Sequence, residues 1–144
     1  MQLADLFTGP GKTVRRPDEI VASVTLPLPV GRTGAAFDRL TRRRGVDLAT
    51  INVCCLVGAG GTTRFAYSAV GPRPVLVEEN GGRLADPSTS EAERETVLRH
   101  PIEKTSPISD VRAERDYRLA MLLVLSKRTL EVSLNRLRSG AGLE

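Results

Sequence analysis

The chain has 144 residues, of which 40% are hydrophobic and 3% aromatic, and its formal net charge is +4. This length accommodates one domain, or one domain with a leading arm, and supplies enough apolar residues for a core. No run approaches the roughly 20 apolar residues of a membrane-spanning helix, and the amino terminus lacks the features of a signal peptide. We therefore expect a cytoplasmic protein without a membrane span.

Residues 1–16 are predicted to form an arm that contains a turn. The sequence Gly-Pro-Gly-Lys-Thr at 9–13 resembles part of a phosphate-binding loop, but the position of that motif's first glycine holds Leu6. We therefore expect no nucleotide phosphate site in the arm. Alternating side chains then predict a strand over 20–26, closed by a proline.

The central part of the chain predicts three further strands. A strand is expected over 37–41, with Phe37, Arg39 and Thr41 sharing one face because side chains alternate at period two. Residues 48–57 are almost entirely apolar, which is typical of a strand buried on both faces or nearly so. A glycine-rich turn then leads to the last of the three strands, which ends at Val70.

The loop between the first two of these strands carries three consecutive arginines, Arg42 to Arg44, followed by Gly45 and Asp47. Like charges in a row repel one another, and a short loop tolerates them when it is solvated or lies near an anion or an electron-rich ring. A solvated hairpin loop is the simplest interpretation from the residues alone.

The two cysteines, Cys54 and Cys55, are adjacent, and His100 is the single histidine. Adjacent residues of a strand point to opposite faces, so these thiols cannot form an unstrained disulfide. The chain lacks the ligands for a zinc or iron–sulfur site. We interpret both cysteines as small buried side chains and predict no metal site and no catalytic residue.

The last part of the chain predicts helices. A short helix is expected to begin over 75–79, a second is expected over 91–99, and the longest over about 114–138, with a leucine stripe at helical spacing. Strands followed by helices indicate an α+β domain, with an antiparallel sheet of three to four strands packed against C-terminal helices. We place this domain at 17–138 and a frayed tail at 139–144.

Three stretches, in this order, resemble one family. They are the segment 7–20, which runs from Phe-Thr-Gly-Pro-Gly-Lys-Thr to Pro-Asp-Glu-Ile; the arginine loop with its flanking strands at 35–53; and the segment 107–118, from Pro-Ile-Ser-Asp-Val-Arg-Ala to Asp-Tyr-Arg. Together they resemble the FAD-binding (medium) subunit of the molybdenum hydroxylases, the relatives of carbon monoxide dehydrogenase and xanthine dehydrogenase. The resemblance covers almost the whole chain and points to the C-terminal part of that subunit, with residues 1–16 as an arm from the end of its FAD-binding domain.

The resemblance implies an oxidoreductase subunit that passes electrons from iron–sulfur clusters through FAD to an acceptor. Iron–sulfur clusters and molybdopterin would belong to partner subunits. In the family, glycine-rich loops of the amino-terminal half hold the FAD pyrophosphate, and this chain has neither of them. We therefore expect a split or truncated subunit, or a domain that works with a separate FAD-binding chain, and no activity from the chain alone.

The resemblance also implies which residues contact the cofactor. Val21 and Arg39 match strand positions of the family, and a cation at Arg39 would favour negative charge on the flavin. Arg42, Arg43 and Asp47 match the loop that runs beside the flavin ring. The alternative that Asp47 only caps the turn stays open.

Two other functions remain open from the sequence. One is a basic nucleic-acid-binding module that uses the arginine loop, although the chain lacks the aromatic residues that usually accompany such basic patches, so we expect no nucleic acid partner. The other is a non-catalytic interaction domain that lacks the FAD pyrophosphate-binding half.

Overall fold

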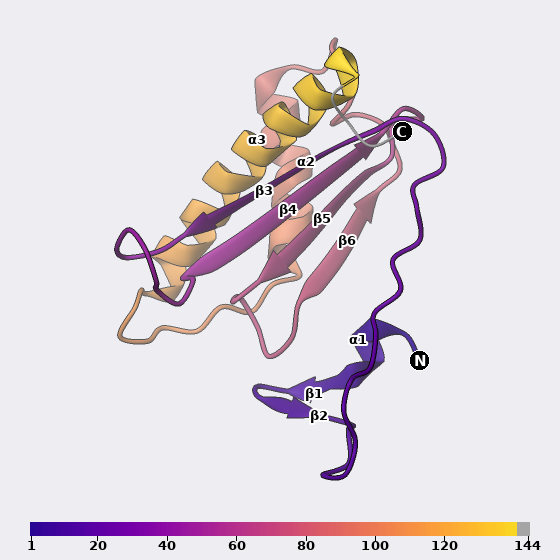
Figure 1. Ribbon diagram of the computed structural model, residues 1–144. Coiled ribbons are helices and arrows are strands. Elements are labelled where there is room, and N and C mark those ends of the chain that lie inside the picture. Colours follow the sequence, from indigo (N-terminus) through magenta and orange to yellow (C-terminus); the bar gives the residue numbers. More distant parts are fainter. Residues whose placement is uncertain (141–144) are drawn as a thin grey trace.

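The computed structural model describes residues 1–140, and its main body is a four-stranded antiparallel sheet with two long helices. The strands pair in the order β3-β4-β5-β6, and both helices, α2 and α3, cover the same face of the sheet (Figure 1). The bounds are β3 (Thr33–Leu40), β4 (Ile51–Gly58), β5 (Thr63–Ser68), β6 (Val75–Glu79), α2 (Glu91–Glu103) and α3 (Arg115–Ser139). The predicted α+β architecture is confirmed.

Strand β4 lies at the centre of the core because its alternate side chains point toward the helices. Ile51, Val53, Cys55 and Val57 are each 0% exposed, whereas the residues between them are half-buried. The strand begins three residues later than predicted, and it is fully buried on one face only. This burial pattern leaves the opposite face of the sheet open.

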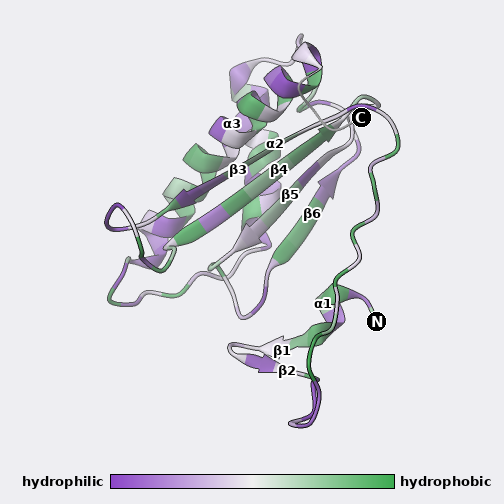
Figure 2. Cartoon of the chain, viewed as in Figure 1, coloured by the Kyte–Doolittle hydropathy of each residue, from purple (hydrophilic) through white to green (hydrophobic). Residues whose placement is uncertain are grey.

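Helix α3 packs along β3 and β4 with hydrophobic and hydrophilic residues alternating along its length (Figure 2). Its most deeply buried leucines are Leu122 and Leu125, beside the stripe predicted from the sequence. At Gly34 of β3 the helix comes so close that a Cβ atom would lie 2.0 Å from the carbonyl oxygen of Ser133. The Ser133 hydroxyl donates to the carbonyl of Cys55 at 3.0 Å, which fixes the helix over the centre of the sheet.

Two predictions for the segment before α3 are wrong. Residues 75–79 form strand β6 and not a helix, because Val75 and Val77 suit the pleated surface and pair with β5. Helix α2 begins with a capping box between Ser90 and Glu93, as its N-cap residues predict. It runs through Pro101 and does not end before it, and this proline lies buried in the last turn of the helix.

The arm forms a small sheet of its own. It consists of α1 (Leu3–Leu6) and a small hairpin of β1 (Phe7–Gly9) and β2 (Lys12–Thr13), and an extended segment then leads to β3 (Figure 1). The strand predicted over 20–26 is wrong, because no strand of the described chain pairs with that segment. The large apolar side chains of residues 20–30 are exposed: Ile20, Val21, Val24, Leu26, Leu28 and Val30.

The carboxyl end of α3 is capped by Gly140, whose φ of 69° is the left-handed conformation that glycine adopts readily. A frayed tail was predicted for 139–144. Ser139 is still helical and Gly140 is the C-cap, and residues 141–144 lie outside the described residues. Among the described residues, no helix is long and apolar enough to cross a membrane.

Candidate functional site

The open face of the sheet carries a row of apolar side chains in register. Phe37 of β3 pairs with Cys54 of β4, which pairs with Ala66 of β5, which pairs with Leu76 of β6. The two outer members are large and solvent-accessible, with Phe37 62% and Leu76 70% exposed. A flat, apolar, uncovered sheet face of this kind is typical of a surface that contacts another molecule.

The neighbouring row on the same face is polar. Arg39 of β3 pairs in register with Asn52 of β4, which pairs with Ser68 of β5. The Arg39 side chain is exposed and makes no hydrogen bond or ion pair within residues 1–140. The Asn52 side-chain oxygen is buried and likewise has no donor within this part of the chain. The row therefore contains a guanidinium, that of Arg39, and a buried amide oxygen, that of Asn52, which lack partners within residues 1–140.

The arginine loop is organised around Asp47, whose side chain is only 5% exposed. One carboxylate oxygen accepts hydrogen bonds from the backbone amides of Arg42, at 3.1 Å, and Arg43, at 3.3 Å. Burial acts to raise the pKa of this carboxyl group, but these amides, that of Leu48 and the Arg42 charge outweigh it and lower the pKa. Asp47 therefore stays ionised and caps the turn.

The three arginine side chains of this loop differ in the partners that they contact. Arg42 keeps a loose ion pair with Asp47 at 3.9 Å, and the Arg43 side chain donates to the carbonyl of Val46 at 3.2 Å. Arg44 has no partner among the described residues. Val46 and Leu48 are 94% and 71% exposed, so the loop offers apolar as well as cationic contacts.

The structure brings together four of the five residues predicted to contact a cofactor. Arg39, Arg42, Arg43 and Asp47 all lie in or beside the loop that follows β3. Val21 does not join them, because the extended segment that carries it runs on the β6 side of the sheet, whereas the loop lies beyond the far end of β3 (Figure 1).

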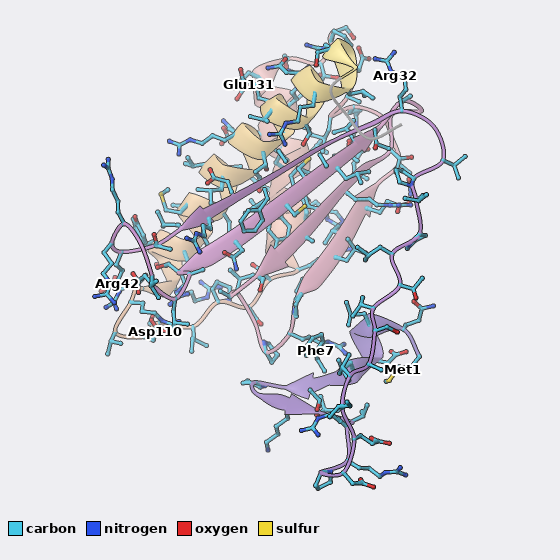
Figure 3. All side chains as sticks on the ribbon, viewed as in Figure 1. Met1, Phe7, Arg32, Arg42, Asp110 and Glu131 are labelled. Carbon is cyan, nitrogen blue, oxygen red and sulfur yellow. The ribbon has the colours of Figure 1, made fainter. Side chains whose placement is uncertain are left out.

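One buried cation beneath the loop was not predicted as part of the site. Arg118 of α3 is 2% exposed and donates to the carbonyl oxygen of Thr50, the residue that joins the loop to β4. Its carboxylate partner, Asp110, lies at the same end of the sheet as Arg42 (Figure 3). The sequence signal was the Asp-Tyr-Arg motif at 116–118. This motif supported the family resemblance, but no role was predicted for its arginine.

The described residues provide no phosphate loop and no metal cluster. The glycine-rich stretch at 58–62 is the hairpin turn between β4 and β5, closed by a hydrogen bond from Gly58 to Thr62, and no helix follows it. The arm motif at 9–13 is likewise a hairpin turn. No group of three potential metal ligands occurs within residues 1–140.

Comparison with known proteins assigns the domain. The sequence model of the CO dehydrogenase flavoprotein C-terminal domain matches residues 35–132, which include the open face, the arginine loop and most of α3. The chain belongs to this family. The match begins just after the start of β3, so the arm and the extended segment lie outside the residues that the family model matches.

Two curated relatives illustrate how the family domain occurs in longer proteins. The carbon monoxide dehydrogenase medium chain of Hydrogenophaga pseudoflava is 26% identical over 134 residues, covering 90% of this chain and 46% of the relative. The FAD-binding subunit of an aldehyde oxidoreductase from Escherichia coli is 28% identical, covering 96% of this chain and 41% of the relative. The chain thus spans less than half the length of these relatives.

Solved structures share the fold of the CO dehydrogenase flavoprotein C-terminal domain. A reconstituted CO dehydrogenase from Oligotropha carboxidovorans matches with a TM-score of 0.76 and 24% identity, covering 92% of this chain and 48% of that one. Quinoline 2-oxidoreductase from Pseudomonas putida matches with a TM-score of 0.72 and 23% identity, covering 92% and 47%. These likenesses support the fold described above.

Proposed function

We propose that this chain is the flavin-covering C-terminal part of the FAD subunit of a multi-subunit oxidoreductase of the molybdenum hydroxylase type. The observation that carries the proposal is the unpaired Arg39 beside the exposed ring of Phe37, on an open sheet face within the region that the family model matches. Two curated relatives that this chain resembles are named as FAD-binding or medium subunits of oxidoreductases.

The described residues fit the ring of a flavin but not its phosphates. An exposed apolar face and a free guanidinium suit a planar, polar-edged ring. Both glycine-rich stretches of the described chain are hairpin turns, which do not provide the helix N-terminus that usually binds pyrophosphate. We therefore infer that FAD is shared with a partner half that holds its phosphates.

The residues of this chain would orient and polarise the ring. Phe37 would pack against it, and the positive charge of Arg39 would favour added electron density on it. Arg42 and Arg43 would flank it, on a loop whose shape Asp47 maintains from within. The predicted contact of Val21 with the cofactor is a separate proposal, since its segment lies away from this loop.

Bound FAD would supply the redox chemistry, taking electrons from the iron–sulfur clusters of one partner subunit and delivering them to an external acceptor. Molybdopterin would lie in a further subunit, which would select the substrate. The six exposed apolar side chains of the segment 20–30 fit a chain that is covered by partners in its working state.

The first test measures FAD retention. The purified chain is incubated with FAD, alone and with a separately expressed FAD-binding half, and flavin absorbance is recorded after desalting. We expect no bound flavin in the chain alone and stoichiometric flavin in the mixture. A stoichiometric yellow protein from the chain alone would contradict the shared-cofactor proposal.

The second test compares two arginines on the open face. Arg39 has no partner, whereas Arg64 is already paired with Glu78. The interaction of a partly desolvated cation with the reduced flavin contributes about 1 to 3 kcal/mol. Its loss lowers the flavin reduction potential by roughly 20 to 60 mV for a two-electron couple. Redox titration of the reconstituted complex should show this fall for Arg39→Ala and an unchanged potential for Arg64→Ala. Equal potentials in both variants would remove Arg39 from the site.

A further inference from the structure

The neck of the arginine loop is tied to the body of the domain through a buried guanidinium. The backbone amide of Thr50 donates to the carbonyl of Leu40 at 2.7 Å, which closes the loop between β3 and β4. Arg118 of α3 then donates to the carbonyl of the same Thr50 at 2.5 Å. A continuous path of hydrogen bonds thus joins α3 to Leu40, the residue next to Arg39.

Arg118 uses its remaining donors on three further groups at this end of the sheet. It reaches the carbonyl of Ala69, at 3.2 Å, the carbonyl of Ala113, at 3.4 Å, and a carboxylate oxygen of Asp110, at 2.6 Å. Ala69 has a φ of 61°, which costs a residue with a side chain about 1 to 2 kcal/mol. The guanidinium therefore holds the strained end of β5 as well as the loop neck.

Asp110 is held in place by several donors at once. Arg112 contributes its amide, at 2.8 Å, and two guanidinium nitrogens, and the amide of Ala113 lies at 3.3 Å. The hydrogen bonds from Arg112, followed by those from Ala113 and Arg118, outweigh burial and hold the pKa of Asp110 well below its usual range. The carboxylate thus stays charged and aims Arg118 at the loop neck.

We propose that Arg118, aligned by Asp110, is a positioning residue that fixes the arginine loop and Arg39 for contact with the flavin, an inference that rests on the proposed function. A hydrophobic side chain would serve stability at a buried position as well as an ion pair does, or better. What only a planar fork with separate nitrogens provides is simultaneous direction of three carbonyls and one carboxylate. The cluster occurs where the candidate site needs defined geometry.

The loop itself is tested in the isolated chain by residue-resolved amide hydrogen exchange. Arg118→Lys keeps a cation beside Asp110 but cannot bridge all four acceptors. Loss of the hydrogen bond to Thr50 should speed exchange at the amides of Arg42, Arg43 and Thr50 by about tenfold. Exchange at Val53 and Phe65, inside the sheet, should stay unchanged.

Arg136→Lys is the matched control, because Arg136 also lies on α3 and binds a sheet carbonyl, that of Ala35, toward the opposite end of the helix. It should leave the loop amides as they are. Equal exchange of the loop in Arg118→Lys and the unaltered chain would overturn the proposal, as would a uniform acceleration across the sheet. If Arg118→Lys does not fold, Asp110→Asn removes the aligning charge with little change of shape, and the same outcomes decide.

The link to the flavin is tested in the reconstituted complex by redox titration. The flavin potential should shift in Arg118→Lys in the same direction as in Arg39→Ala, and should stay constant in Arg136→Lys. A shift in Arg39→Ala without one in Arg118→Lys would overturn the positioning role while leaving the proposed function intact. If the unaltered chain forms no flavin-containing complex with its partner half, the proposed function fails, and the flavin part of this inference fails with it.

Discussion

Helix α3 and strand β3 approach so closely at Gly34 that we expect replacement by alanine to force them apart. The added Cβ would lie 2.0 Å from the Ser133 carbonyl oxygen, 2.6 Å from the Leu137 amide nitrogen and 3.0 Å from the Leu137 Cβ. The first two obstacles are backbone atoms of a helix, which cannot rotate away as a flexible side chain can. The strand and helix must therefore separate by roughly 1 Å or more, which would weaken the dispersion contacts along this part of their interface.

The cost follows from that rigidity. Overpacking in a well-packed core costs about 1 to 3 kcal/mol, and occasionally more. Because backbone atoms obstruct the new methyl group, we expect the upper end, about 3 kcal/mol. For a domain of this size, 1 kcal/mol lowers Tm by roughly 3 to 5 °C, so Gly34→Ala should lower Tm by about 10 °C or more.

Thermal unfolding followed by far-ultraviolet circular dichroism measures this effect. Gly60→Ala is the matched control, because no heavy atom lies within 4 Å of a Cβ there and its φ is not in the left-handed region. That substitution should change stability by less than about 0.5 kcal/mol. If both variants unfold at the same temperature as the unaltered chain, β3 and α3 do not approach each other this closely at Gly34.

Two further predictions concern titration and thiol chemistry. The pKa of Asp110 is lowered in the folded state, so its contribution to stability is present above its unfolded pKa of about 4 and is lost as pH falls toward the folded value. Tm should therefore fall steeply below about pH 4, and it should fall less in Asp110→Asn. An equal fall of Tm with pH in both proteins would contradict this prediction. Burial raises the pKa of Cys55 to about 12 and also raises that of Cys54. Cys54 is half-buried and Cys55 is 0% exposed, so a thiol reagent should modify the native chain slowly at Cys54 and reach Cys55 only on unfolding; mass spectrometry of the labelled peptide decides this.

Side-chain periodicity predicted the parts of the fold in which burial is asymmetric. The alternation around Phe37 and Arg39 correctly placed both on one face of β3, and the apolar stripe correctly located α3. The same alternation failed at 20–26, because it shows that a segment can be a strand and not that a neighbouring strand exists to pair with it. At 75–79 a short helix, cut off by the glycines that follow, was predicted, but these residues form a strand because they pair with β5.

The candidate site was predictable only where it is local in sequence. The turn-capping role open to Asp47 could be anticipated, since its partners are four and five residues away. The contacts of Arg118 with Thr50 and Ala69 span 68 and 49 residues, so no spacing rule reveals them. The resemblance to a family marked the segment around Arg118 without indicating what the arginine does.

The extended segment between the arm and β3 has a consequence for the lifetime of the chain in a cell while nothing covers this segment. Its backbone between residues 20 and 31 lies outside every strand pair of the described chain, and its side chains include Leu28, 86% exposed, and Val30, 103% exposed. Proteases readily cleave such a stretch, and chaperones bind sequences of this kind. Covering the segment would prevent both cleavage and chaperone binding. A copy whose segment stays uncovered would therefore be short-lived.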